Sequence, residues 1–248
     1  MIDFSKIPIP PEPTFEESAA TFKPIWEAAA HCTIDAWPQA IMDLSVPTTL
    51  IEIDNATSPL IYEYGNPDAY ALMDEYAAKI DAITGWKEHF IRLSTRSPKD
   101  VAPDERPITL SGKQAMWWIS NSERCLDDIT AAHFTNNRIY IAVRELYHAA
   151  QGGEFRCFAK DGKVIAISRY DFHKPARIEY DGAAITETIA PWYEKNIAEH
   201  YPTVVFDVDL GVHGRTDPLL IEVNPYGLSH PCLFNGYADI EQSGGFRA

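Results

Sequence analysis

Residues 203–225 read TVVFDVDLGVHGRTDPLLIEVNP and contain two apolar segments that are typical of neighbouring β-strands. Side chains alternate between the two faces of a strand, so Asp207 and Asp209 share one face of the first segment. By the same rule, Glu222 and Asn224 share one face of the second segment. The sequence therefore predicts that oxygen-bearing side chains gather on one side of this part of the fold.

An antiparallel hairpin with a loop at residues 212–217 pairs Asp207 with Glu222 and Asp209 with Leu220. Like charges directly opposite each other destabilise a sheet, and a bound cation reverses that effect. Two carboxylates and a neutral asparagine oxygen leave room for water and phosphate, which suits Mg²⁺. The alternative is a solvated sheet face without a ligand. It is disfavoured because each carboxylate lies inside a strongly apolar strand.

The rest of the chain mixes hairpins with helices. The segments EFRCFAK and KVIAISRY flank Asp161-Gly162, a preferred turn pair, and predict a second hairpin with Arg169 opposite Glu154. Periodicity predicts further strands at 48–53, 89–94 and 138–146, and helices at 15–31, 67–83, 111–133 and 191–201. This combination indicates the α+β class rather than a doubly wound parallel sheet.

The charge balance restricts the possible partners. The chain has 248 residues, with 21 Lys and Arg against 36 Asp and Glu, which gives a net charge of −15. Such a surface repels nucleic-acid phosphates and anionic lipids. No apolar run is long enough to span a membrane, Met1 is not followed by an apolar export segment, and the four cysteines form no C-x-x-C pair. We therefore expect a cytoplasmic protein with no membrane contact, and nucleic acid is disfavoured as a partner.

Familiar nucleotide and catalytic motifs are missing from the sequence. It contains no G-x-x-x-x-G-K-[ST], G-x-G-x-x-G, H-E-x-x-H or G-x-S-x-G. Basic residues are sparse, so the segment FIRLSTRSPK is conspicuous, with Arg92, Arg96 and Lys99. Arg144 and Arg156 lie in two other predicted strands. Taken singly, each arginine is better explained by a surface salt bridge worth less than about 1 kcal/mol.

Six short segments have a shared order and spacing that is more specific than any one of them. They are FIRLS at 90–94, SPKD at 97–100, VRE at 143–145, EFRCF at 154–158, FDV at 206–208 and IEVNPYG at 221–227. Together they resemble the cell-division-cycle 123 family, a divergent branch of the ATP-grasp superfamily. The resemblance implies two α+β lobes with ATP and Mg²⁺ between them. We expect an N-terminal lobe at 1–142 and a C-terminal lobe with the metal site at 143–248.

The resemblance, together with the basic cluster, also assigns residues to the site. The expected nucleotide-binding residues are Arg92, Arg96, Lys99, Arg144, Glu145, Leu146, Tyr147 and Arg156. The implied metal ligands are Asp207, Glu222 and Asn224, which the hairpin argument also brings together. The chain departs from the family pattern at four positions. Arg92 and Glu222 stand where the family usually has lysine and aspartate, and Asp209 stands where an aromatic residue is usual. Arg169 is shifted by one place relative to the family's arginine.

Three functions are compatible with such a site. The first is an ATP-dependent carboxylate–amine or carboxylate–thiol ligase that forms an acyl phosphate on a protein, peptide or small molecule. Arg156 and Arg92 would then neutralise charge on the transferred phosphoryl group. The second is an assembly factor of the translation initiation factor two type, in which ATP organises a protein-docking surface. The third, an RNA ligase or repair enzyme, is disfavoured by the charge of −15.

Overall fold

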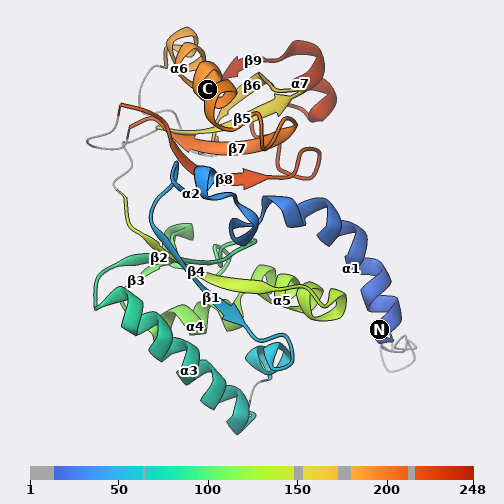
Figure 1. Cartoon of the computed structure of the whole chain (residues 1–248), viewed down its shortest axis with the longest axis vertical. Coiled ribbons are helices and arrows are strands. Elements are labelled where there is room, and N and C mark those ends of the chain that lie inside the picture. The colour runs from blue at the N-terminus through green and yellow to red at the C-terminus, as the bar shows by residue number, and fades with distance from the viewer. Residues whose placement is uncertain (1–13, 64, 148–152, 173–179, 212–215) are drawn as a thin grey trace, which may run out of the picture.

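The computed structural model describes residues 14–248 except 64, 148–152, 173–179 and 212–215, and contains two β-sheets with helices packed against them (Figure 1). The α+β class predicted from the sequence is confirmed. Among the residues described, no helix is long and apolar enough to cross a membrane.

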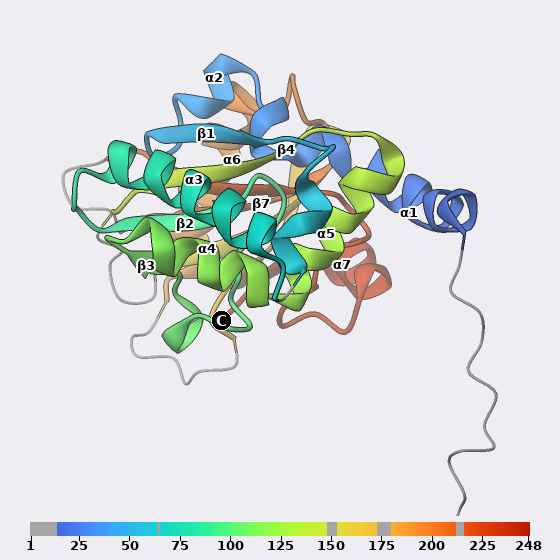
Figure 2. The ribbon, with the colours of Figure 1, turned by 90° about the horizontal axis from the view of Figure 1, so that it is seen from below.

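The first sheet has the strand order β1-β4-β2-β3, and its neighbouring strands are antiparallel. Its strands are β1 (Thr48–Ile53), β2 (His89–Leu93), β3 (Ile108–Thr109) and β4 (Ile139–Glu145). The helical segments of this lobe are η4 (Ser58–Tyr62), α3 (Pro67–Thr84), η5 (Pro103–Glu105), α4 (Gly112–Asn121) and α5 (Glu123–Thr135). Helices α3, α4 and α5 cover one face of the sheet (Figures 1 and 2), where Ile80, Ile91 and Ile129 share one core.

The second sheet has the order β8-β7-β5-β6-β9, in which β9 runs parallel to β6 and the other neighbours are antiparallel. Its strands are β5 (Glu154–Lys160), β6 (Lys163–Arg169), β7 (Val204–Asp209), β8 (Leu219–Asn224) and β9 (Gly245–Arg247). Helix α6 (Gly182–Asn196) packs on one face, where Tyr193 stacks on Phe206 at 5.0 Å. Helix α7 (Tyr237–Ser243) contributes Ile240 to a core on the other face, with Phe158 and Val205. Strand β7 is therefore buried on both sides.

An N-terminal segment joins the two sheets. It contains α1 (Phe15–Ala29), η2 (Ala30–Cys32), η3 (Ile34–Ala36) and α2 (Gln39–Met42). Ile34, Trp37 and Ile41 belong to the same core as the α6 face of the second sheet. The backbone N–H of Ile34 also donates to the Ser94 carbonyl beyond β2, at 3.0 Å. The segment thus packs against both sheets, and β4 extends the first sheet past the expected domain boundary at residue 142.

Some helices differ in extent from the prediction. The continuous helix expected at 111–133 is two helices, because the Ser122 hydroxyl accepts the Cys125 N–H and begins α5. The helix expected at 191–201 starts earlier, because Asp181 caps α6 and Pro191 lies inside it.

Two β-bulges change the predicted strand pairings. The pairing of Asp207 with Glu222 is confirmed. The pairing of Asp209 with Leu220 is wrong, because a bulge next to Asp207 pairs Asp209 with Leu219. The pairing of Arg169 with Glu154 is also wrong. A bulge beside Phe158 shifts the register, so that Arg169 lies opposite Phe155.

Candidate functional site

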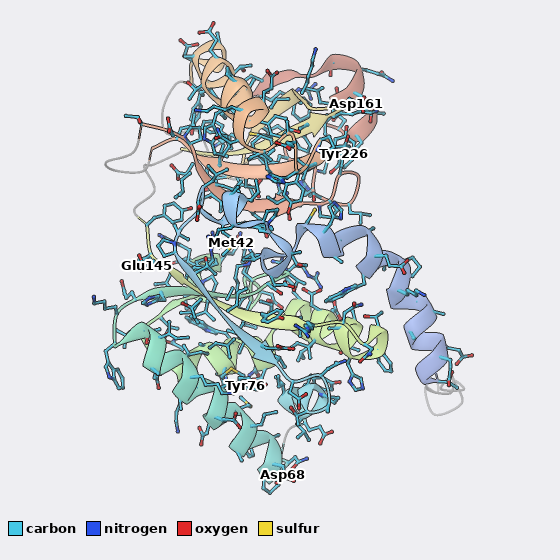
Figure 3. All side chains as sticks on the ribbon, in the orientation of Figure 1. Met42, Asp68, Tyr76, Glu145, Asp161 and Tyr226 are labelled. Carbon is cyan, nitrogen blue, oxygen red and sulfur yellow. The ribbon has the colours of Figure 1, made fainter. Side chains whose placement is uncertain are left out.

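Three neighbouring strands of the second sheet place charged side chains in one row. Arg156 on β5 lies opposite Asp207 on β7, and Asp207 lies opposite Glu222 on β8. Arg92 on β2 of the first sheet completes the row, because its Nη2 lies 2.6 Å from Glu222 Oε1. The row therefore runs from one lobe to the other. Figure 3 shows the side chains of both lobes, with Met42 and Glu145 labelled near the boundary between them.

The pair formed by Arg156 and Asp207 is deeply buried. Arg156 Nε and Nη2 donate to the two carboxylate oxygens of Asp207 at 2.8 and 2.7 Å, and the side chains are 9% and 1% exposed. Burial raises the pKa of Asp207, and the hydrogen bonds from Arg156 oppose that change. The guanidinium also lies over the Tyr170 ring, 5.0 Å from its centroid, and donates to the His230 carbonyl at 3.3 Å.

The pair formed by Arg92 and Glu222 links the two lobes. Besides Glu222, Arg92 donates to the carbonyls of Leu93 and Thr95, so its orientation is fixed from its own lobe. Burial raises the pKa of Glu222, but Arg92 and neighbouring cations outweigh it and lower the pKa to about 2. Glu222 is therefore ionised at neutral pH.

Arg144 is a buried cation whose hydrogen bonds go to neutral groups, and it makes no ion pair with a carboxylate among the described residues. It is 3% exposed. Its Nη1 donates to the Ile221 carbonyl at 3.0 Å and its Nη2 to Ser45 Oγ at 2.6 Å, while Nε is buried without a hydrogen-bond partner. Burial, together with repulsion from Arg92, lowers the pKa of Arg144 to about 10.

Lys99 lies at the same boundary between the lobes. Its Nζ donates to the Tyr170 hydroxyl at 3.1 Å. Burial lowers the pKa of Lys99, but attraction from Tyr170 and Glu222 outweighs burial and leaves it raised. Lys99 is therefore charged and adjacent to the row.

The other predicted site residues have different positions. Arg96 is not in the row: it binds both carboxylate oxygens of Asp128 on α5, with Nη2 2.7 Å from Oδ1. Asn224 reaches the row, since its Nδ2 lies 3.4 Å from Asp207 Oδ2. Glu145 is the last residue of β4, and its N–H donates to the Pro47 carbonyl, while Leu146 and Tyr147 follow the strand.

Several residues beside the row had no assigned role in the sequence prediction. The pKa of Glu154 is raised to about 8, mainly by burial and to a lesser extent by repulsion from Asp207. Asp209 is fully buried, and burial raises its pKa although Oδ1 accepts the Gly211 N–H at 2.7 Å. The alternation that selected Arg156 also indicates Glu154, two residues earlier on the same strand. No sequence signal indicates Tyr170 or Ser45, because their roles depend on contacts between the lobes.

These charges make the row suitable for an anion. Four cations, Arg92, Lys99, Arg144 and Arg156, lie around two carboxylates, Asp207 and Glu222, and the pKa of Glu222 is lowered to about 2. The pKa of Glu154, raised to about 8, leaves that carboxyl mostly uncharged at neutral pH. The region therefore carries excess positive charge in a chain whose net charge is −15.

The donor set also fits Mg²⁺. Two carboxylates on opposed strands and an adjacent amide supply the hard oxygen ligands that this ion prefers. In the part of the chain that is described, no cluster of three or more His, Cys, Asp or Glu side chains is arranged to hold a metal. A metal at this site would therefore need further oxygen ligands from water or phosphate.

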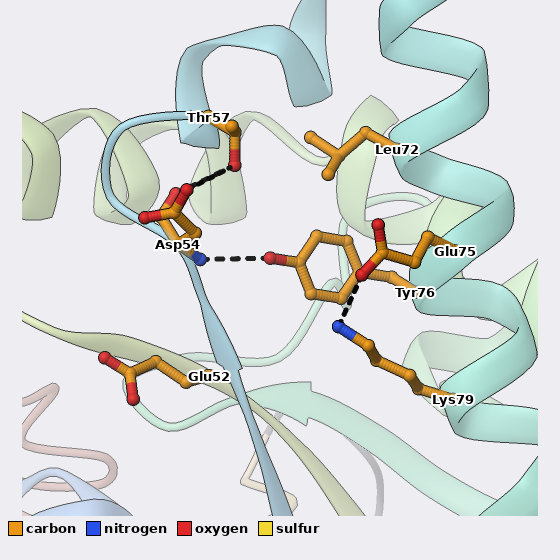
Figure 4. A pocket seen from close by; sticks show the side chains of 7 residues that line it. All are labelled: Glu52, Asp54, Thr57, Leu72, Glu75, Tyr76 and Lys79. Atoms are coloured by element: carbon orange, nitrogen blue, oxygen red, sulfur yellow. Dashed lines mark hydrogen bonds and ion pairs between the residues drawn. The ribbon is translucent and has the colours of Figure 1, made fainter.

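A separate pocket lies on the first lobe (Figure 4). Its lining residues are Glu52, Asp54, Thr57, Leu72, Glu75, Tyr76 and Lys79. Its polar groups are engaged with one another: the Asp54 N–H donates to the Tyr76 hydroxyl at 3.0 Å, and Lys79 lies 2.7 Å from Glu75. None of the predicted site residues lines this pocket.

Comparison with known proteins identifies the fold and the family. The structure is similar to C-terminally truncated Cdc123 from Schizosaccharomyces pombe, with a TM-score of 0.70 and 18% identity over 88% of this chain and 95% of that chain. A RimK-domain ATP-grasp protein from Sphaerobacter thermophilus also matches, with a TM-score of 0.38 and 12% identity over 84% of this chain and 60% of that chain.

In sequence, the chain is 32% identical over 88 residues to a translation initiation factor eIF2 assembly protein from Danio rerio. That match covers 35% of this chain and a quarter of the relative's length. The D123 family profile matches residues 120–245, which is just over half of the chain. The family resemblance seen in the sequence is thus confirmed, and the protein belongs to the D123 family.

Proposed function

We propose that this protein is an assembly factor that binds Mg·ATP between its two lobes and uses the bound nucleotide to organise a protein-binding surface. The observation that carries the nucleotide part is the excess of buried positive charge between the lobes of an acidic chain. Buried charges are costly unless they are compensated. A polyphosphate supplies the missing negative charge.

The residues of the row and those beside it would bind different parts of Mg·ATP. Arg92, Lys99 and Arg156 would contact phosphate oxygens, since arginine in particular matches their geometry, and Arg144 would add positive charge beside them. Asp207, Glu222 and Asn224 would hold Mg²⁺, and the backbone at Glu145, Leu146 and Tyr147 would face the adenine. When bound, Mg²⁺ neutralises charge on the phosphate oxygens. Arg92 and Arg156 at present compensate the two carboxylates, so they would exchange a carboxylate for phosphate as the ligand binds.

The assembly role is favoured over ligation by the character of the relatives. The matched relative is named as an eIF2 assembly protein. We therefore propose an eIF2-type subunit as the partner, and the net charge of −15 favours a basic docking face on that partner. Four free, buried cysteines agree with a reducing cytoplasmic location.

Thermal unfolding tests the nucleotide site. At about 100 times the dissociation constant, a ligand adds about 2.7 kcal/mol of stability, or about 5–10 °C for a chain of this size. We expect this shift with ATP and Mg²⁺ together, and we expect Arg92→Gln to reduce it. Arg96→Gln is the matched control, because Arg96 is bound to Asp128 outside the row. The absence of a wild-type shift, or an equal loss in both variants, would contradict the proposed site.

A second measurement separates assembly from ligation. Binding of purified eIF2 subunits to immobilised protein is measured with Mg·ATP and with EDTA, and ADP release is measured with and without added carboxylate substrates. An assembly factor predicts partner binding that depends on Mg·ATP without carboxylate-dependent ADP release. ADP release that requires an added carboxylate and amine, without partner binding, would instead establish the ligase.

A further inference from the structure

Strand β8 carries Glu222 at the edge of the second sheet, so only one side of this strand pairs with a neighbour in the sheet. The other side is held from the first lobe and its N-terminal segment. The Leu220 N–H donates to the Leu44 carbonyl at 3.0 Å, and the Ser45 hydroxyl donates to the Leu220 carbonyl at 2.6 Å. The Ile221 carbonyl accepts from Arg144 at 3.0 Å.

These contacts meet at the bulge of β8. Glu222 pairs with Asp207 and Leu220 pairs with Val208, which leaves Ile221 as the extra residue. A bulge locally disrupts the ladder and redirects the side chains beside it. The residue next to this bulge is Glu222, whose carboxylate must lie opposite Asp207 and within reach of Arg92.

Arg144 and Ser45 form one unit around the bulge. Ser45 Oγ accepts from Arg144 Nη2 at 2.6 Å while it donates to the Leu220 carbonyl. Arg144 and Ser45 are 3% and 7% exposed, so water does not readily replace these hydrogen bonds. Both outer nitrogens of Arg144 thus bind the protein, at Ile221 and at Ser45, and its Nε is buried without a hydrogen-bond partner.

We infer that Arg144, acting with Ser45, is a positioning residue that fixes the β8 bulge and thereby orients Glu222 for metal binding. This inference rests on the proposed Mg·ATP site and gives Arg144 a role different from the nucleotide contact expected from the sequence. The rigid fork of arginine suits the task, because it donates in two directions at once, to Ile221 and to Ser45. Groups that hold metal ligands in place typically contribute about 10-fold to 100-fold to metal affinity.

Two substitutions separate positioning from phosphate contact. Arg144→Lys keeps a positive charge but cannot reproduce the two-directional fork. Ser45→Ala keeps Arg144 and removes only the hydroxyl between it and Leu220. Thr48→Ala is the matched control, because the Thr48 hydroxyl donates to the Val46 carbonyl rather than to β8.

The first readout is hydrogen exchange in the ligand-free protein. We expect Arg144→Lys and Ser45→Ala to raise amide exchange across Leu219–Asn224 by about 10-fold, as local opening becomes easier, and Thr48→Ala to leave it unchanged. Unchanged exchange in both test variants would overturn the inference, whatever their effect on ligands.

The second readout is nucleotide affinity measured with Mg²⁺ and with EDTA. Positioning predicts that both variants lose about 10-fold of the affinity gained from Mg²⁺ and keep the wild-type affinity in EDTA. An Arg144→Lys loss of equal size in EDTA, with Ser45→Ala unaffected, would make Arg144 a phosphate contact and overturn the inference. A wild-type protein that binds no nucleotide would instead refute the proposed function, and the inference with it.

Discussion

Replacing Asp207 by asparagine should destabilise the protein strongly, because it removes one partner of a buried ion pair at nearly constant volume. The two hydrogen bonds from Arg156 are 2.8 and 2.7 Å long, and both side chains are less than a tenth exposed. After the substitution, one amide oxygen can still accept a hydrogen bond from Arg156, but the second acceptor and the negative charge are lost. A cation is then buried without its counter-ion.

Breaking such a pair costs about 3–5 kcal/mol of unfolding free energy. For a chain of this length, that lowers the melting temperature by about 6–20 °C. Urea denaturation followed by tryptophan fluorescence measures the free energy directly. The matched control is Asp128→Asn, which breaks a pair whose arginine, Arg96, is 40% exposed, and it should cost about 1 kcal/mol or less.

The double variant Asp207→Asn/Arg156→Gln tests the cause of the loss. If the loss comes from an uncompensated buried charge, removing the cation as well should recover most of it. The reasoning is refuted if Asp207→Asn unfolds within about 1 kcal/mol of the wild type, or if the double variant is no more stable than the single one.

Three further predictions concern other parts of the molecule. Because the pKa of Glu154 is raised from 4.5 to about 8, the free energy of unfolding should fall by at most about 5 kcal/mol as pH rises through that interval. Glu154→Gln should flatten the measured stability–pH curve there, and an unchanged slope would refute the shift. Gly112→Ala should lower the free energy of unfolding, measured in urea, by more than about 2 kcal/mol, because a Cβ would lie 2.0 Å from the Ala77 carbonyl oxygen and force α3 and α4 apart. Wild-type stability of this variant would contradict that packing. Ser122→Ala should lower the free energy of unfolding by about 1–2 kcal/mol, because it removes the hydroxyl that accepts the Cys125 N–H and caps α5. Ser122→Thr should retain most of the stability in the same assay, and equal losses in the two variants would exclude capping as the cause.

The pairing of Asp207 with Glu222 could be predicted because strand alternation and a hairpin loop are local properties of the sequence. The bulge that moves Asp209 from Leu220 to Leu219 could not, because its residues are ordinary apolar strand formers. Its position depends on contacts from Ser45, far away in sequence. Local pattern therefore predicted the carboxylate pair but not the distortion beside it.

Among the basic residues, too, the position of one could be predicted from the sequence and that of another could not. Arg92 and Arg96 are close in sequence, yet only Arg92 reaches Glu222. Arg92 lies on β2, whose direction is fixed by the sheet, whereas Arg96 follows in a loop and turns toward Asp128 on α5. A strand residue has two possible faces, so its choice can be argued from alternation. A loop residue has no such restriction, and its partner becomes known only from the fold.

The contacts that join the lobes involve the same residues that we propose bind the ligand. Arg92 bonds to Glu222 across the boundary, and Lys99 bonds to Tyr170. A polyphosphate that attracts Arg92 and Lys99 competes with both contacts, while a cation that neutralises Glu222 removes the reason for Arg92 to remain there. Ligand binding must therefore change the energy that holds the lobes together. A protein surface formed by both lobes then depends on the nucleotide without any need for a covalent step, which is the coupling that an assembly factor requires.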